Sequence, residues 1–573
     1  MVRMMGKHAM VEMLRLEGVE YVFGNPGTTE LPLIDALQDA PDIKYVLTLF
    51  EGVAAGMADG WARIKQKPAF MNFHISVGVS NSIAVMYNSW RGGTPMVITA
   101  GQSHSSLQLH EPTLYSNMVN VMREYTKWSG EIVSPQDIPS ILRRAFKIAS
   151  TPPTGPVFLS VAWDAFTGEA EMDLRPSIND YYGIRPDLGA IGKASSVLGH
   201  AERPIIIIGD RVAQSSGAPY YVSKIAEQLG AAVFATSYSE VHISNSHPHY
   251  MGTFDVSWLH SATQRRLNEA DVILAIGTDI LTSSIPIPEP ALGDKVQVVH
   301  VDSSEWAIQR SFPAVVGLWS DIRSGLDDLT SALDAEMSGS QKLAARQRCK
   351  LVVKEQIRRR ERIDNRLLKR WNNSPMSPER FAYELRNALP PGVLICDDSI
   401  TNRSTLLDTL EFDVPGTLVG GRGGSLGFGM GATLGMKLAA PDRPVIGIIG
   451  DGTAMYTIQS LWTAANYNIP VVYVFCNNGS YKVLKENMAR YLTGTERKST
   501  YLGMDFYDTP IDFVKQANAY GLEGIRVEDP TRLGPALDQA LATGRPYVLD
   551  VIIDDQFNEI DIQEAWGEWW ARK

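Results

Sequence analysis

Short runs of apolar residues recur along the chain and alternate with stretches whose apolar residues have helical spacing. The runs are five to seven residues long, and they include positions 95–100, 204–209, 271–277, 296–302 and 445–449. Such runs are typical of strands that are buried on both faces of a sheet. Helical patterns lie at positions 10–16, 52–64 and 457–467, and a charged helical stretch from about 340 to 373 is expected to connect two domains. The alternation predicts parallel sheets with helices on both faces.

The alternation occurs in three successive blocks, which predicts three domains. A chain of 573 residues is too long for a single hydrophobic core. We expect α/β domains with doubly wound parallel sheets over residues 1–185, 186–345 and 346–573, the second of them Rossmann-like. No GxGxxG sequence follows a strand. Internal duplication is therefore favoured over a dehydrogenase, while a nucleotide site in the middle domain stays an open alternative.

Composition narrows the class of protein. Apolar residues make up 44% of the chain and charged residues 20%, as in ordinary globular proteins. No apolar run approaches the roughly 20 residues that cross a bilayer. The net charge of −11 argues against nucleic-acid binding. The first residues lack the apolar segment of a signal peptide, and the three cysteines have no disulfide or zinc spacing. We therefore expect a cytoplasmic protein without nucleic-acid or membrane partners.

The most informative polar residues follow two apolar runs of the third block. Asp451 and Gly452 come directly after the run at 445–449 and Gly450, and Asn478 comes after the run at 471–476. Open α/β sheets bind ligands at the carboxyl ends of their strands, so we expect Asp451 and Asn478 in one crevice. Carboxylate and amide oxygens bind hard cations such as Mg²⁺ or Ca²⁺. Gly452 lets a diphosphate approach the backbone, and a helix expected near Thr453 directs N–H groups at it.

Two further candidates lie in the first block. Glu51 precedes a helix of small and apolar residues, which predicts a dry environment in which its carboxyl group exchanges protons near neutral pH. A glutamate in the first turn of a helix otherwise compensates the helix dipole. His74 ends a strand expected at 68–74, and its imidazole makes it a candidate general acid–base.

Both regions resemble thiamine-diphosphate enzymes. GDG, followed after a helix and a strand by NN, resembles their diphosphate-binding motif, and EGVAAGMADGWAR resembles their glutamate helix. The resemblance implies a pyrimidine-binding first domain and a third domain that binds diphosphate and metal. Glu51 would contact N1′ of the aminopyrimidine and promote the ylid. Gly424 would accept the 4′-amino hydrogen bond through its carbonyl, and Leu426 would wedge beneath the cofactor. The other matching positions are Ser480, whose carbonyl would bind the metal, and Ser399, Thr401, Thr453 and Tyr481 near the diphosphate.

Within this family the chain is most similar to the benzoylformate decarboxylase branch. Matching segments lie at 23–28, 30–32, 68–74 and 461–470. The resemblance implies that Thr28, in place of a serine, orients the substrate carboxylate and that His74 transfers protons. It also implies active sites shared between subunits, and therefore a homodimer or homotetramer.

The chain departs from that branch around the expected pocket. Ser284 falls where the branch has a second active-site histidine, and Gly420 and Asn487 replace two aromatic residues. Changed pocket walls predict a different acyl group. Arg422 and Lys485 are candidate anion contacts. The candidate replacements for the missing histidine are His104 and His110.

The leading hypothesis is non-oxidative decarboxylation of a 2-oxoacid to an aldehyde through ylid and enamine intermediates, with a carboligase side activity left open. The alternative is an acetolactate-synthase-like carboligase, in which the enamine attacks a second carbonyl compound instead of taking up a proton. Only the acceptor pocket separates the two reactions. The sequence leaves the 2-oxoacid, the acceptor and the pathway open.

Overall fold

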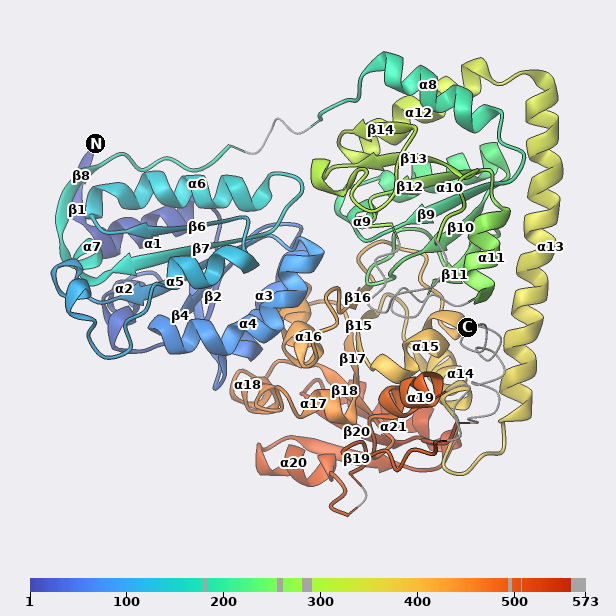
Figure 1. Ribbon diagram of the computed structural model, residues 1–573. Coiled ribbons are helices and arrows are strands. Elements are labelled where there is room, and N and C mark those ends of the chain that lie inside the picture. The colour runs from blue at the N-terminus through green and yellow to red at the C-terminus, as the bar shows by residue number, and fades with distance from the viewer. Residues whose placement is uncertain (179–182, 255–260, 281–290, 493–496, 507, 558–573) are drawn as a thin grey trace.

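The structure is a computed structural model, and it describes residues 1–573 except 179–182, 255–260, 281–290, 493–496, 507 and 558–573. Three lobes, each built on a six-stranded parallel sheet, meet near the centre of the molecule (Figure 1). The predicted fold class of three α/β domains is thus confirmed. The sheets use strands from residues 21–162, 204–319 and 394–552. The proposed domain limits between these segments stay a prediction.

The first sheet has the strand order β3-β2-β4-β5-β7-β6. Its apolar strands form because both of their faces are covered by helices. One face packs on α3 (Glu51–Lys65) and α4 (Ile75–Gly92), and the other on α1 (Gly6–Leu16) and α6 (Ile138–Ser150). The strands are β2 (Tyr21–Asn25), β3 (Lys44–Leu47), β4 (Ala69–Phe73), β5 (Met96–Gln102), β6 (Trp128–Ile132) and β7 (Pro156–Ala162). A separate antiparallel pair joins β1 (Val2–Met5) to β8 (Glu169–Met172).

The middle sheet has the order β11-β10-β9-β12-β13-β14. Three of its strands confirm predicted runs, namely β9 (Pro204–Ile208), β12 (Val272–Ile276) and β13 (Gln297–Asp302). The others are β10 (Ala232–Ala235), β11 (Tyr250–Thr253) and β14 (Val316–Trp319). Helices α8 (Leu188–Gly199), α10 (Ala218–Leu229) and α12 (Ile322–Glu336) pack on one face.

A long helix, α13 (Gly339–Lys369), leads from the middle domain to the third along the right side of Figure 1. It confirms the charged helical connection expected there. In the described part of the chain no helix, α13 included, has both the length and the apolar character needed to cross a bilayer.

The third sheet has the order β16-β15-β17-β18-β20-β19. Its central strands β15 (Leu394–Asp398), β17 (Val445–Gly450) and β18 (Val472–Asn477) are buried throughout, and all end at the same edge because they run parallel. The remaining strands are β16 (Leu418–Gly420), β19 (Glu523–Val527) and β20 (Tyr547–Ile552). This shared edge is where the polar motifs of the third block lie.

Close packing of α3 against α16 (Phe428–Ala439) joins the first and third domains. Glycines allow the two backbones to touch, since a Cβ added to Gly60 or Gly435 would overlap backbone atoms of Ala432 or Met57 on the other helix. The small residues of α3 therefore allow this contact and also surround Glu51 with an environment that excludes water. Every residue of α3 from Glu51 to Arg63 is buried.

The helix expected over 457–467 is shorter than the sequence suggests. The structure has a single turn, α17 (Asp451–Ala454), and then α18 (Ser460–Asn466). Between them, the buried Thr457 hydroxyl donates to the Gly427 carbonyl at 2.6 Å. This bond ties the chain to the loop before α16 instead of letting a continuous helix form.

Candidate active site

Asp451 and Asn478 lie side by side at the ends of neighbouring strands, as expected. Asp451 follows β17, and its carboxylate accepts hydrogen bonds from the N–H groups of Gly452 (2.7 Å), Asn478 (3.0 Å) and Gly479 (2.7 Å). Burial raises the pKa of Asp451 to about 6, although these backbone bonds oppose the shift. No cationic side chain among the described residues forms an ion pair with this carboxylate.

The donor set around Asp451 fits a hard cation. The Asn478 side-chain oxygen accepts a 3.0 Å hydrogen bond from the Ser480 N–H, which turns both residues into the same crevice. The Ser480 hydroxyl is buried and has no hydrogen-bond partner among the described residues. One buried carboxylate, one amide oxygen and nearby backbone oxygens are what Mg²⁺ or Ca²⁺ binds while keeping positions for phosphate oxygens.

The expected diphosphate residues surround this crevice. A Cβ on Gly452 would lie 2.5 Å from the Tyr481 ring, so glycine allows α17 to approach that ring. Thr453 is buried one residue further on. Ser399 follows β15, and its hydroxyl donates to Asp397 at 2.6 Å, which fixes the turn that carries Thr401.

The loop before α16 carries Gly424 and Leu426. Gly424 has φ +82°, a conformation that favours glycine. The loop is fixed from the first domain by Asn88 of α4, which accepts hydrogen bonds from the N–H groups of Gly423 (2.9 Å) and Ser425 (3.2 Å) and donates to the Ser425 carbonyl (2.8 Å). Leu426 is half-buried beside it.

Glu51 opens α3 and is 4% exposed. Its two oxygens accept hydrogen bonds from the side-chain amides of Asn25 (3.3 Å) and Asn81 (2.9 Å). A Cβ on Gly78 would lie 3.2 Å from the same carboxylate. Glu51 is thus held against the first turns of α4 by neutral donors, which support a carboxylate without a cationic partner.

His74 caps the N-terminus of α4 and so lies at the same helix end as the contacts of Glu51. Its Nδ1 lies 3.0 Å from Glu30 Oε2 and 3.3 Å from the Thr29 hydroxyl. Thr28 is exposed at the start of the short helix that also contains Thr29 and Glu30. A Cβ on Gly27 would overlap the His74 ring. The structure therefore gathers Thr28, Glu51 and His74 around one end of α4.

Backbone strain marks both regions. Ile75, next to His74, has φ +33°, and Ile400, between Ser399 and Thr401, has φ +48°. β-branched residues rarely adopt positive φ, and such strain concentrates at functional sites.

The two regions form separate halves within one chain. Arg63, at the far end of α3, lies over the Phe428 ring at 5.9 Å, beside the loop of the third domain. Glu51 is twelve residues earlier, about 18 Å along the helix axis. Glu51 lies against Gly78 near the start of α4, whereas the loop before α16 is held by Asn88 near the end of α4, so the two groups of candidate residues lie apart within one chain.

Sequence reasoning missed the residues that hold the candidates in place. The fully buried Glu30 accepts from the N–H groups of Gly27, Ile75 and Gly101 as well as contacting His74, and its only signal was its place in the matching segment at 30–32. The other missed residues are Asn25, Asn81, Asn88 and Asp398.

The residues expected around the substrate pocket lie in different surroundings. Arg422 is buried in an ion pair with Glu240, and Lys485 pairs with Asp505 and Asp555. His104 and His110 are exposed on the loop after β5. Gly420 ends β16 in the core, and Asn487 lies on α19 (Lys482–Tyr491). Ser284 lies outside the described residues.

The chain is similar to known proteins over most of its length. Models of the thiamine pyrophosphate enzymes match residues 4–121 (N-terminal TPP binding domain), 191–329 (central domain) and 404–551 (C-terminal TPP binding domain). The chain is 31% identical to a benzoylformate decarboxylase of Pseudomonas aeruginosa, covering 95% of this chain and 98% of the relative. It is 28% identical to a "Probable acetolactate synthase large subunit" of Methanocaldococcus jannaschii, covering 96% and 92%.

A solved structure is similar over nearly the whole chain. It is the thiamine diphosphate-dependent 4-hydroxybenzoylformate decarboxylase of Rhodococcus jostii, with a TM-score of 0.82 and 26% identity. The match covers 97% of this chain and all of the other.

Proposed function

Because this chain belongs to the thiamine pyrophosphate enzyme family, we propose that it decarboxylates a 2-oxoacid to an aldehyde without oxidation. The observation that carries the proposal is the cluster at the end of α4, where a buried carboxylate and a histidine lie together. The full-length similarity to a benzoylformate decarboxylase supports the same reaction class. When bound, thiamine diphosphate supplies the carbanion chemistry and accepts the electrons left by carbon dioxide.

The first-domain residues have distinct roles in this proposal. Glu51, held by two amides, gives and takes a proton at the aminopyrimidine. Thr28 presents its hydroxyl to the substrate carboxylate. Glu30 holds Nδ1 of His74, so Nε2 is the atom that exchanges protons with substrate and product.

The third-domain residues hold the cofactor. Asp451, Asn478 and the Ser480 carbonyl bind Mg²⁺ or Ca²⁺, and the buried, uncompensated Asp451 carboxylate supports this assignment. Gly452, Thr453, Ser399, Thr401 and Tyr481 surround the diphosphate, while Gly424 and Leu426 orient the aminopyrimidine end.

The proposal includes a homodimer or homotetramer. The separation of the two halves along α3 supports it, because a second chain is then needed to bring a Glu51 to each cofactor. The substrate is a small 2-oxoacid, and the oxygen ligands around Asp451 suit Mg²⁺ or Ca²⁺. The free cysteines Cys349, Cys396 and Cys476 fit a reducing, cytoplasmic compartment.

A second reaction is supported by the similarity to an acetolactate synthase. In a carboligase of this type a second carbonyl compound takes the place of the proton supplied by His74. The two reactions consume the same donor and differ in the organic product. Product analysis therefore separates them.

The first experiment measures carbon dioxide release from a panel of 2-oxoacids with added thiamine diphosphate and Mg²⁺. We expect release that needs both additions and falls about 100-fold or more in Glu51→Gln, because general acid–base groups contribute that much. Glu336→Gln, an exposed change of the same type at the end of α12, serves as the control and keeps full activity.

Each product has a clear meaning. An aldehyde supports the decarboxylase, and a 2-hydroxyketone supports the carboligase. No release from any acid by a protein that binds the cofactor would contradict the proposed reaction, as would full activity in Glu51→Gln.

A further inference from the structure

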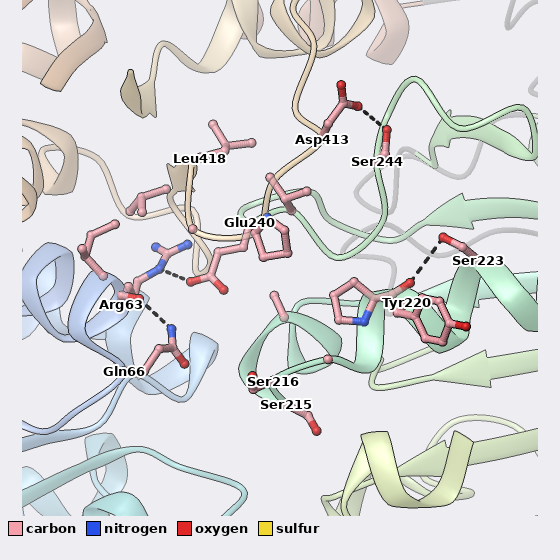
Figure 2. A pocket seen from close by; sticks show the side chains of 18 residues that line it. Arg63, Gln66, Ser215, Ser216, Tyr220, Ser223, Glu240, Ser244, Asp413 and Leu418 are labelled. Carbon is pink, nitrogen blue, oxygen red and sulfur yellow. Dashed lines mark hydrogen bonds and ion pairs between the residues drawn. The ribbon is translucent and has the colours of Figure 1, made fainter. Parts of the chain in front are cut away.

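A pocket with a volume of about 490 Å³ lies where the three domains meet (Figure 2). It is bounded by the end of α3, the first turns of α10, residues 240–244 of the middle domain and the chain around β16. None of the residues proposed for catalysis or cofactor binding lines it. Its volume is in the range of small-molecule sites, which combine apolar walls with a few polar groups. The apolar lining residues are Ile64, Ala213, Pro219, Val241, Pro415, Leu418 and Val419.

One wall of the pocket carries a buried carboxylate. Glu240 is 5% exposed, and its Oε1 accepts a 2.6 Å hydrogen bond from Nε of Arg63 and also pairs with Arg422. Both arginines thus contact the same oxygen. No described residue donates a hydrogen bond to the other oxygen, Oε2. This oxygen lies on the side of the carboxylate away from Arg63 (Figure 2). Asp413, a second carboxylate, lies across the pocket and accepts from the Ser244 hydroxyl.

The one arginine that lines the pocket is not available to an anion. Besides Glu240, its guanidinium donates to the carbonyls of Gly420 (2.7 Å) and Ser239 (2.6 Å) and pairs with Asp59 (3.3 Å). All three nitrogens of Arg63 therefore have acceptors. The charged lining is then two carboxylates and one arginine that is already paired.

We propose that this pocket binds a small organic cation, a primary amine with an apolar substituent. The ammonium group donates to Oε2 of Glu240, where a charge-assisted hydrogen bond inside a buried site is strong. The apolar substituent lies against Leu418, Pro415 and Ile64. Asp413 adds a second attraction at the opposite side.

Glu240 links the pocket to the cofactor loop. Arg422 donates to the Gly92 carbonyl at 2.7 Å and stands two residues before Gly424, so its pair with Glu240 helps to fix that loop. The Ser239 carbonyl also accepts from the Gly420 N–H at 2.8 Å. An ammonium group on Oε2 weakens the hold of both arginines on Oε1, because three cations then share one carboxylate. Amine and cofactor should therefore weaken each other's binding reciprocally, a consequence that rests on the proposed function, whereas amine binding itself does not.

Isothermal titration calorimetry tests the site with 2-phenylethylamine as the probe. Its neutral N-acetyl derivative and the anion 3-phenylpropanoate are the matched ligands. We expect the amine to bind about tenfold or more tightly than either, because only it can make the charge-assisted bond. Glu240→Gln should remove this preference, and Glu336→Gln should keep it. Equal binding of the three probes, or no binding of the amine to the full-length protein, would overturn the site.

A second variant keeps the test decisive if Glu240→Gln does not fold. Ser216 is exposed at the pocket wall, so Ser216→Trp fills the space without touching the buried ion pairs. We expect it to abolish amine binding, and unchanged affinity would contradict the location. The coupling is measured by titrating the amine with and without thiamine diphosphate and Mg²⁺. We expect about fivefold weaker binding with them, and identical affinities would overturn the link to the cofactor loop.

Discussion

Glu30 is fully buried, and its carboxylate orients the residue proposed to transfer protons. It accepts hydrogen bonds from the backbone N–H groups of Gly27 and of Gly101 in β5, and it lies 3.0 Å from Nδ1 of His74. A carboxylate at Nδ1 favours the tautomer with its proton on Nδ1, which leaves Nε2 free to accept a proton. The same arrangement explains Gly27, whose missing side chain makes room for the imidazole ring.

Glu30→Gln should lower kcat about 10- to 100-fold and leave KM nearly unchanged, because residues that orient a functional histidine have effects of this size. The fold should survive, since the glutamine oxygen still accepts hydrogen bonds. Steady-state kinetics on the acid found by the carbon dioxide assay provides the measurement. An equal rise in KM with unchanged kcat would instead indicate that Glu30 serves substrate binding.

Asp398 provides a prediction about pH. Its side chain accepts a 2.9 Å hydrogen bond from the Gly429 N–H at the start of α16, and burial raises its pKa from 3.8 to about 6. A raised pKa in the folded state means that the stabilisation is present in full below the unfolded pKa and is lost as pH rises through about 6. Relative to Asp398→Asn, wild-type protein should lose up to about 3 kcal/mol between pH 4 and pH 7.

Thermal unfolding of the cofactor-free protein at several pH values measures this difference. The asparagine keeps an oxygen for the Gly429 N–H, so both proteins should fold. A difference in thermal midpoint between wild type and variant that stays constant across the pH range would show that Asp398 does not titrate there.

At the scale of elements, the contact between α3 and α16 places the functional ends of both helices. Glu51 begins α3, and the loop with Gly424 and Leu426 leads into α16. Because glycines let the backbones touch, the two helices act as one rigid unit. The small-residue pattern that first indicated a dry environment for Glu51 is therefore also a packing requirement.

Gly435→Ala should lower stability by about 1–3 kcal/mol, because the added Cβ would overlap the Met57 backbone in a core without free space. The matched control is Gly339→Ala at the start of α13, where a Cβ meets nothing within 4 Å. The loss appears as a lower thermal midpoint for the first variant alone. Equal midpoints for both variants would show that the helices can separate at no cost.

The sequence identified the central strands of the sheets because buried parallel strands are continuous apolar runs. It singled out Asp451, Asn478, Glu51 and His74 as candidates because each follows such a run or begins a helix. It overestimated the helix at 457–467, since the bond from Thr457 to Gly427 is a tertiary contact. The sequence did not predict the buried contacts of Glu30, Asn88 and Glu240, because their partners are distant along the chain.

At the scale of the molecule, one chain holds the two groups of proposed site residues apart. The first half gathers around the end of α4, and the second at the edge of the third sheet. Asn88 and Arg422 tie the first domain to the third within the chain, at the end of α4 remote from His74. A rearrangement that closes the halves on each other would have to break these buried contacts. A second copy of the chain meets the requirement without such a cost.

Mixing two inactive variants tests whether the sites are shared between chains. Glu51→Gln disables the first half, and Asp451→Asn disables the second by removing the metal carboxylate. In a mixed dimer, one site combines both lesions and the other combines two intact halves. Random exchange of equal amounts should restore about a quarter of wild-type activity, because half of the dimers are mixed and half of their sites are intact. If each chain forms its own site, every site keeps one lesion, so a mixture that stays inactive after subunit exchange would contradict the shared arrangement.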